Sequence, residues 1–172
     1  MYSLPSLSNF TKIFFVAALL VTVASCERQS CKNVVCPVGQ NCYQGNCYCP
    51  DGYEGTDCQT ESYLKYTSLN NFASESCNQS PPFITSSCFI QQGSSVNQLQ
   101  IYGLMGGNCS PTYALIRTDT NNEGNIVEIP EQNCGGSTIS GQGTYDKLNG
   151  RLNLQLYYNF SGSIFQCNTT LY

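Results

Sequence analysis

The chain of 172 residues contains no histidine and no tryptophan, and only 10% of its residues are charged. The absence of histidine excludes histidine-based catalysis and histidine metal ligation. The absence of tryptophan removes the strongest stacking side chain, although 12 tyrosines and 8 phenylalanines remain. The seven basic residues are scattered, so there is no footprint for nucleic acid and no electrostatic membrane patch. No phosphate-binding loop or dinucleotide fingerprint is present.

Long hydrophobic runs are also scarce, and the one that exists lies near the N-terminus. Lys12 precedes an apolar run over residues 13–21, and small residues follow it up to Ser25. The run is too short to span a bilayer comfortably, which favours a signal peptide over residues 1–25. A transmembrane anchor is the alternative interpretation.

Cysteine, in contrast, is abundant, with twelve in the chain. Because the leader predicts export into an oxidising compartment, disulfide bonds are the expected state of most of these residues.

The leader ends in Val23-Ala24-Ser25-Cys26. This sequence resembles the lipobox of bacterial lipoproteins. The resemblance implies cleavage before Cys26, lipidation of its sulfur and anchoring to a bacterial membrane, which we expect to be the outer membrane. The alternative is ordinary cleavage nearby, with Cys26 free or disulfide-bonded and the protein secreted.

Six closely spaced cysteines follow in the pattern C-x4-C-x5-C-x4-C-x-C-x8-C. A segment this short cannot bury a sufficient core, so it needs covalent cross-links, although the spacing alone leaves their pairing open. The end of the pattern, with Gly55 three residues before the last cysteine, resembles the EGF-like family. The resemblance implies an EGF-like module over residues 27–59. It also implies three disulfides: Cys31–Cys42, Cys36–Cys47 and Cys49–Cys58.

We expect this module to bind no metal and the protein to need no cofactor. Residues 27–30, ahead of the first cysteine, lack the acidic pattern of calcium-binding EGF-like modules. Cys47 and Cys49 are too close together for a usual pair of zinc ligands. Gly45-Asn46 predicts a hairpin turn.

Residues 62–172 alternate short β-type runs with turn residues, and no segment keeps helical apolar spacing. The expected strands are 62–69, 84–91, 98–104, 112–118, 126–129, 137–145, 151–159 and 163–171. The fold class is therefore mostly β. We expect a small disulfide-rich EGF-like module followed by an antiparallel β-meander that forms a barrel or a sandwich.

The layout of leader, Cys26, one EGF-like module and a C-terminal β domain resembles a group of small bacterial lipoproteins whose β domain is lipocalin-like. Gly141-Gln142-Gly143-Thr144 and the closing segment from Cys167 contribute to this resemblance. It implies a surface or periplasmic lipoprotein and no particular chemistry.

Five cysteines lie in the β domain, an odd number. The first and last strands of a closed meander are neighbours, which predicts a Cys77–Cys167 disulfide. Cys109–Cys134 is favoured among the others because both residues lie in glycine-rich turns. Cys88, within a strand, is then expected to be a buried free thiol.

Two groups of side chains are candidates for a site. Four acids cluster around a predicted hairpin and, like Asp51 and Asp57, are interpreted as solvated loop charges: Asp119, Glu123, Glu128 and Glu131. Five tyrosines can line a ligand face or simply pack between strands: Tyr102, Tyr113, Tyr145, Tyr157 and Tyr158.

No catalytic residue is assigned, and the protein is not expected to be an enzyme. The sequence favours a non-enzymatic, membrane-anchored lipoprotein that acts as a binding or adhesion module for an extracellular protein or glycan. A lipocalin-like carrier of a small apolar ligand is the alternative, and a hydrolase ranks third. In a eukaryotic secretory context, Asn78, Asn159 and Asn168 would be glycosylation acceptors.

Overall fold

The computed structural model describes residues 31–69, 72–78 and 83–172. The chain divides into two compact units, considered separately below. Of the described residues, 31–37 and 41–47 belong to the first unit, and 38–40 and everything from Tyr48 onward belong to the second. The second unit therefore takes in part of the range expected for the EGF-like module. Residues 1–25, expected to be a signal peptide, and Cys26 and residues 27–30 lie outside the described residues.

The first unit contains a hairpin of β1 (Asn41–Tyr43) and β2 (Asn46–Tyr48), whose last residue, Tyr48, is counted with the second unit. Two disulfides, Cys31–Cys42 and Cys36–Cys47, hold it. The hairpin turn is one residue earlier than expected. It is formed by Gln44 and Gly45, both with positive φ (49° and 83°), whereas Asn46 belongs to the second strand. Two consecutive positive φ values are the requirement of a type I′ turn, whose twist matches that of the two strands.

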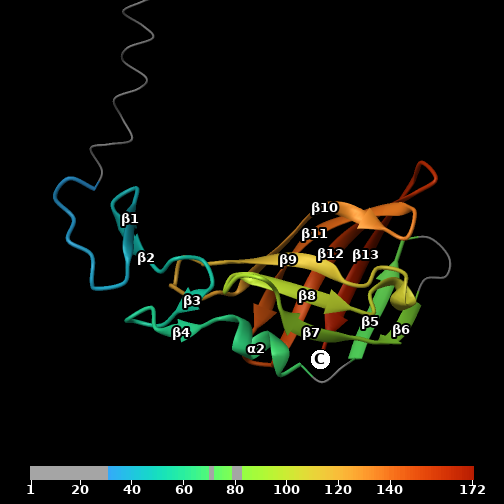
Figure 1. The fold of residues 1–172 in the computed structure, drawn as a ribbon, viewed down its shortest axis with the longest axis horizontal. Helices are drawn as coiled ribbons and strands as arrows, with labels where there is room; N and C mark the ends of the chain where they lie inside the picture. Colours follow the sequence, from blue (N-terminus) through green and yellow to red (C-terminus); the bar gives the residue numbers. More distant parts are fainter. Residues whose placement is uncertain (1–30, 70–71, 79–82) are drawn as a thin grey trace, which may run out of the picture. The chain divides into compact units, whose positions relative to one another are not determined.

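The second unit begins with two short paired strands, β3 (Tyr53–Glu54) and β4 (Thr60–Glu61), and the Cys49–Cys58 disulfide. Helix α2 (Tyr63–Thr67) follows. The remaining elements form one antiparallel sheet: β5 (Phe72–Cys77), β6 (Phe83–Ser87), β7 (Phe89–Gln92), β8 (Gln98–Tyr102), β9 (Thr112–Arg117), β10 (Ile126–Cys134), β11 (Ser137–Asp146), β12 (Arg151–Phe160) and β13 (Ser163–Leu171). A 3-10 helix, η1 (Met105–Gly107), lies between β8 and β9. Figure 1 shows these elements along the chain.

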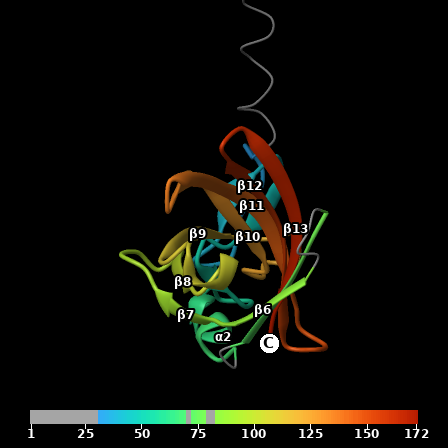
Figure 2. The same ribbon diagram turned by 90° about the vertical axis from the view of Figure 1, so that its right-hand side faces the viewer.

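The sheet is a curled half-barrel with the strand order β6-β5-β13-β12-β11-β10-β9-β8-β7. β6 and β7 stand at opposite ends of this order, yet only Cys88 separates them in sequence. They are the two halves of one bent strand, so the sheet has eight strands. Figure 2 shows the strands arranged around the curl. The mostly β architecture and the antiparallel meander expected from the sequence are confirmed.

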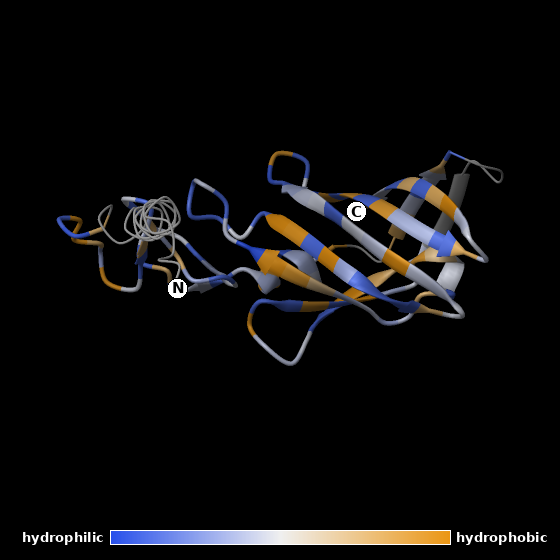
Figure 3. Ribbon diagram, turned by 90° about the horizontal axis from the view of Figure 1, so that it is seen from above, coloured by the Kyte–Doolittle hydropathy of each residue, from blue (hydrophilic) through white to orange (hydrophobic). Residues whose placement is uncertain are grey.

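Every second residue of the long strands points into the curl. Along β12, Leu152, Leu154, Leu156 and Tyr158 are buried, and the residues between them lie on the outer side. In Figure 3 this appears as alternating hydrophobic and hydrophilic bands along the strands. Residues from the neighbouring strands fill the same interior: Leu99, Ile101, Ala114, Ile116, Val127, Ile129, Ile139 and Leu171. The period of two thus separates the core from the outer face.

Two inward-facing glycines let β12 pack closely on β11. A Cβ atom on Gly143 would lie 2.1 Å from the Asn153 carbonyl oxygen and 2.7 Å from the Leu154 side chain. A Cβ atom on Gly141 would lie 2.4 Å from the Gln155 carbonyl oxygen and 2.9 Å from the Leu156 side chain. The side chains of Leu154 and Leu156 occupy the space that larger residues on β11 would need.

The strand expected over residues 62–69 is wrong, because helix α2 lies there. Tyr66 and Leu69 are buried three residues apart, and the Tyr66 hydroxyl donates a hydrogen bond of 2.6 Å to the Gly124 carbonyl oxygen. Local preference of tyrosine and threonine for strands is weak compared with such tertiary contacts. The first strand of the sheet is instead β5, which was not expected as a strand.

Candidate functional site

The outer side of β11, β12 and β13 carries an open depression of about 490 Å³. Six outward-pointing polar side chains line it, and we refer to them as the polar face: Gln142, Thr144, Asn153, Gln155, Asn168 and Thr170. Ile126, Gly143 and Leu154 contribute to its wall and floor. All of these residues belong to the second unit.

Strand register places the polar face in two cross-strand rows. Thr144 is opposite Asn153, which is opposite Thr170; Gln142 is opposite Gln155, which is opposite Asn168. Adjacent strands lie about 4.8 Å apart, and residues two apart along a strand lie about 6.7 Å apart. The polar face is therefore a regular array of amide and hydroxyl groups.

The polar face carries no charged side chain, and the charges at its margin have partners of their own. Glu128 extends the Gln142 row onto β10, where its carboxylate accepts a 2.9 Å hydrogen bond from Arg117 Nε. At the other margin, the Arg151 guanidinium lies 4.6 Å from the centre of the Tyr172 ring. The electrostatic character of the depression is consequently that of neutral dipoles.

Much of the hydrogen-bonding capacity of the polar face is unused within the protein. Thr170 Oγ1 donates to Asn153 Oδ1 at 3.1 Å, and the Tyr157 hydroxyl donates to Gln155 Oε1 at 3.1 Å. The side chains of Gln142, Thr144 and Asn168 make no hydrogen bond to another described residue. Each amide offers two donors and a carbonyl acceptor, so this surface can both donate and accept.

The five candidate tyrosines do not share one face. Tyr158 is fully buried, Tyr145 packs edge-on against Tyr66 with ring centroids 5.4 Å apart, and Tyr102 stacks on Phe89 at 4.4 Å. Only Tyr113 and Tyr157 are well exposed, at 44% and 39%. Tyr157 lies on β12 two residues beyond Gln155, so its ring borders the polar face.

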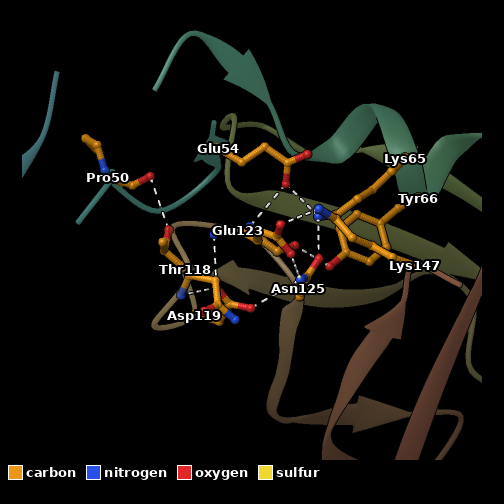
Figure 4. A network of polar contacts seen from close by, with 11 residues as sticks. Pro50, Glu54, Lys65, Tyr66, Thr118, Asp119, Glu123, Asn125 and Lys147 are labelled. Atoms are coloured by element: carbon orange, nitrogen blue, oxygen red, sulfur yellow. Dashed lines mark hydrogen bonds and ion pairs between the residues drawn. The ribbon is translucent and has the colours of Figure 1, made fainter. Parts of the chain in front are cut away.

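The candidate acids do more than carry solvated charge. Asp119 organises the 119–125 loop, because its Oδ1 accepts backbone N–H bonds from Asn121 (2.8 Å) and Glu123 (3.0 Å). Glu123 pairs with Lys147, and the hydrogen bond from Lys147 lowers the pKa of Glu123. Figure 4 shows these side chains converging on Asn125. Glu131 is exposed, and the side chain of Glu128 is held by Arg117.

Two acids before the sheet tie the start of the second unit to the end of β9 and to the 119–125 loop. Asp51 accepts a 2.9 Å hydrogen bond from Arg117 and a 3.1 Å bond from the Thr118 N–H. Glu54 Oε2 contacts Lys65 Nζ at 2.5 Å and accepts from the Gly124 N–H at 3.1 Å (Figure 4). Asp57 caps its own turn by accepting from the Gln59 N–H. These contacts use the carboxylates structurally and give no pair of free acids.

A buried acid that sequence reasoning missed lies inside the curl. Glu75 on β5 is fully buried. Its Oε1 accepts from the Tyr158 hydroxyl (3.0 Å) and Thr169 Oγ1 (3.3 Å), and its Oε2 accepts from the Met105 N–H (3.0 Å). Burial raises the pKa of Glu75 in spite of these bonds. The alternation of β5, with Ala73 and Glu75 pointing inward, was the available signal, but that strand was not expected.

The described cysteines form five disulfides, and their pairs are those expected from the sequence. The two in the β domain are Cys77–Cys167, with Cα atoms 4.0 Å apart, and Cys109–Cys134, with Cα atoms 4.7 Å apart. Cys77 and Cys167 are direct register partners on β5 and β13. Cys88 is a buried free thiol, and burial followed by the nearby Glu75 charge raises its pKa to about 12. That direction is opposite to the one a reactive thiol requires.

Among the described residues, no three metal-ligating side chains gather into a group that could hold a metal ion. Neither α2 nor η1, within the described part of the chain, has the length and apolar character of a membrane-spanning helix. No family model, curated protein or solved structure matches the chain.

Proposed function

We propose that the chain is an exported, non-enzymatic lipoprotein whose β domain is a binding or adhesion module. The observation that carries this proposal is the polar face, an open array of neutral amide and hydroxyl groups with hydrogen-bonding capacity left free. Polar groups inside the fold are paired with one another, as Glu75, Tyr158 and Thr169 are, whereas those of the polar face are directed to solvent. Left exposed at a depression, they are available to a partner.

The cysteine-rich N-terminal region supports an extracellular setting for this module. Five disulfides within the described residues suit an oxidising compartment. On this proposal the region up to residue 59 is an EGF-like spacer, and lipid on Cys26 attaches the chain to a bacterial membrane, with the outer membrane as the expected location. The spacer then presents the β domain to its partner.

The lipocalin-like carrier is the second candidate, and the packing of the curl argues against it. A carrier needs an apolar cavity inside the barrel. Large side chains that are fully buried occupy this interior, among them Tyr158, Leu99 and Leu156. The depression that is lined by free polar groups lies on the outer side of the sheet instead.

A cell-adhesion assay tests this proposal directly. Bacterial cells that display the full chain are expected to be retained on at least one surface from a panel coated with collagen, fibronectin, laminin or purified glycans. The variant Asn153→Lys with Asn168→Lys is expected to abolish that retention, because it places two charges in a neutral depression. Gln91→Lys, an exposed residue on the outer side of β7, is the control and should leave retention unchanged. Retention on no surface, or equal retention of all three proteins, would contradict the proposal.

The anchor is tested separately by Cys26→Ser. This change is expected to move the protein from the membrane fraction to the soluble fraction. Unchanged partitioning into detergent would remove the lipidation from the proposal and leave the binding module as it is.

A further inference from the structure

We infer that the partner of the polar face is an uncharged carbohydrate chain, such as a neutral polysaccharide on another cell or in an extracellular matrix. The inference rests on the proposed function and names its ligand class. It is drawn from four observations on the same surface: its neutrality, its free donors and acceptors, its spacing, and an exposed aromatic ring at its border.

Neutrality selects against charged partners. A nucleic acid, an acidic polysaccharide or an acidic peptide would be held by basic groups, because charge-assisted hydrogen bonds are the strong ones. The polar face offers only amides and hydroxyls, and the nearest charges have partners of their own. Glu128 pairs with Arg117, Arg151 lies over the Tyr172 ring, and Asp146 accepts hydrogen bonds from its own turn. An uncharged ligand needs no opposite charge on the protein.

The free groups match the chemistry of sugar hydroxyls. A sugar hydroxyl is at once donor and acceptor, and a carboxamide such as Gln142 or Asn168 offers a donor and an acceptor side by side. Those two amides and the Thr144 hydroxyl make no hydrogen bond to another described residue. They can therefore pair with a polyol without breaking any bond within the protein.

The spacing of the array fits a chain of rings better than a single small molecule. The two rows run across three strands that lie about 4.8 Å apart, and the rows are about 6.7 Å from each other. These separations are close to those between non-adjacent hydroxyl groups on one ring and between groups on consecutive rings. The depression is open to solvent, so an extended chain can lie across it.

Tyr157 supplies the apolar contact that carbohydrate recognition also needs. Its ring is 39% exposed, and its hydroxyl donates to Gln155 Oε1, which fixes the ring beside the polar face. The C–H surface of a sugar ring can cover this aromatic face, as ligands do on exposed tyrosines. Ile126, 37% exposed, adds apolar area at the opposite side of the depression.

The test uses the full chain, exported with its own leader in a bacterial host that does not glycosylate asparagine. Affinity electrophoresis measures its migration in gels that contain a glucan, a mannan or a galactan, with polygalacturonate as the acidic counterpart. At least one neutral polysaccharide is expected to retard the protein, and polygalacturonate is not.

Near-isosteric variants locate the binding. Gln142→Glu and Asn168→Asp replace amide donors by charged acceptors of nearly the same shape, and each is expected to weaken retardation about tenfold. Tyr157→Ala should have a similar effect, whereas Tyr157→Phe should restore most of the binding because the ring is kept. Gln91→Glu, on β7, is the matched control and should bind as the unaltered protein does.

The outcomes separate this inference from the proposed function. If the polar face variants abolish adhesion to a protein surface while no neutral polysaccharide retards the chain, the ligand class is wrong and the binding module stands. Retardation by polygalacturonate alone also overturns the ligand class. If a neutral polysaccharide retards the chain but Gln142→Glu and Asn168→Asp bind normally, the assignment to the polar face is wrong. If the chain binds no surface and no polysaccharide in the two assays, both the proposed function and the ligand class are wrong.

Discussion

Asn168 and Thr169 are consecutive residues of β13 that face opposite environments. Asn168 points outward into the depression and makes no hydrogen bond to another described residue. Thr169 points inward, is 1% exposed and donates to the buried Glu75 carboxylate. The same strands therefore carry two polar groupings, one inside and one outside. The inner one is closed on itself and the outer one is open, which on the proposed function separates groups that stabilise the fold from groups that bind a partner.

The largest effect is expected from removing the cross-link between β5, which carries Glu75, and β13, which carries residues of both groupings. Cys77→Ser with Cys167→Ser removes the cross-link between β5 and β13, which closes a loop of 90 residues. In the chain-entropy model this lowers the free energy of unfolding by about 4 kcal/mol, measured by urea denaturation under non-reducing conditions. Cys109→Ser with Cys134→Ser opens a loop of only 25 residues and should cost less. A loss below about 1 kcal/mol for the first pair would contradict the structure.

Glu75→Ala tests the closed inner grouping alone. It leaves the Tyr158 hydroxyl and the Met105 N–H without their acceptor in the core, so we expect the free energy of unfolding to fall by about 3 kcal/mol. Asn168→Ala, its outer counterpart, should change that energy by less than about 0.5 kcal/mol. Equal losses in urea denaturation would show that the outer amide is also structural.

The pH dependence of stability distinguishes the two groupings further. Burial raises the folded-state pKa of Glu75 above its ordinary value of 4.5, so the folded protein holds this proton more tightly than the unfolded chain. The stabilising contribution is complete below that ordinary value and is lost as the pH rises through the raised pKa. As the pH rises from acidic to neutral, Glu75→Gln should therefore become more stable relative to the unaltered protein. Parallel curves of unfolding free energy against pH would contradict this.

The smallest effect concerns the buried thiol at the end of β6. Cys88 has a pKa raised to about 12, so a thiol reagent is expected to label the native protein very slowly and the unfolded protein rapidly. Cys88→Ala should abolish this labelling. Rapid labelling of the native chain at Cys88 would show that the interior is open to solvent.

The sequence was sufficient to predict those features that depend on the residue pattern of one strand or on the curling of the sheet. The period of two in residues 151–159 gave β12, and the neighbouring of first and last strands gave the Cys77–Cys167 disulfide. The odd number of cysteines in the β domain left at least one without a partner there, and the preference for Cys109–Cys134 made Cys88 that residue. For β12 and for the Cys77–Cys167 disulfide a single geometric rule was sufficient, because the residues involved alternate along one strand or must meet when the sheet curls.

Features that depend on strand register or on tertiary contacts could not be predicted from the residue pattern of a single segment. Helix α2 is five residues long and exists because Tyr66 reaches the Gly124 carbonyl, which lies 58 positions away in the sequence. An acidic residue between two serines, as in Ser74-Glu75-Ser76, is expected on the surface. Its burial can be predicted only when its hydrogen-bonding partners on β12 and β13 are known. The rows of the polar face require the pairing of Gln142 with Gln155 and of Gln155 with Asn168, which no single strand reveals.

The bend at Cys88 has a consequence for crowded surroundings. Because β6 and β7 pair with opposite ends of the sheet, each half of this strand keeps one side without a strand partner. η1 lies against β6, and α2 lies against β7. An uncovered strand edge would invite a neighbouring molecule to add its own strand. Helical elements next to both terminal strands therefore oppose the joining of sheets between copies of the chain at high concentration.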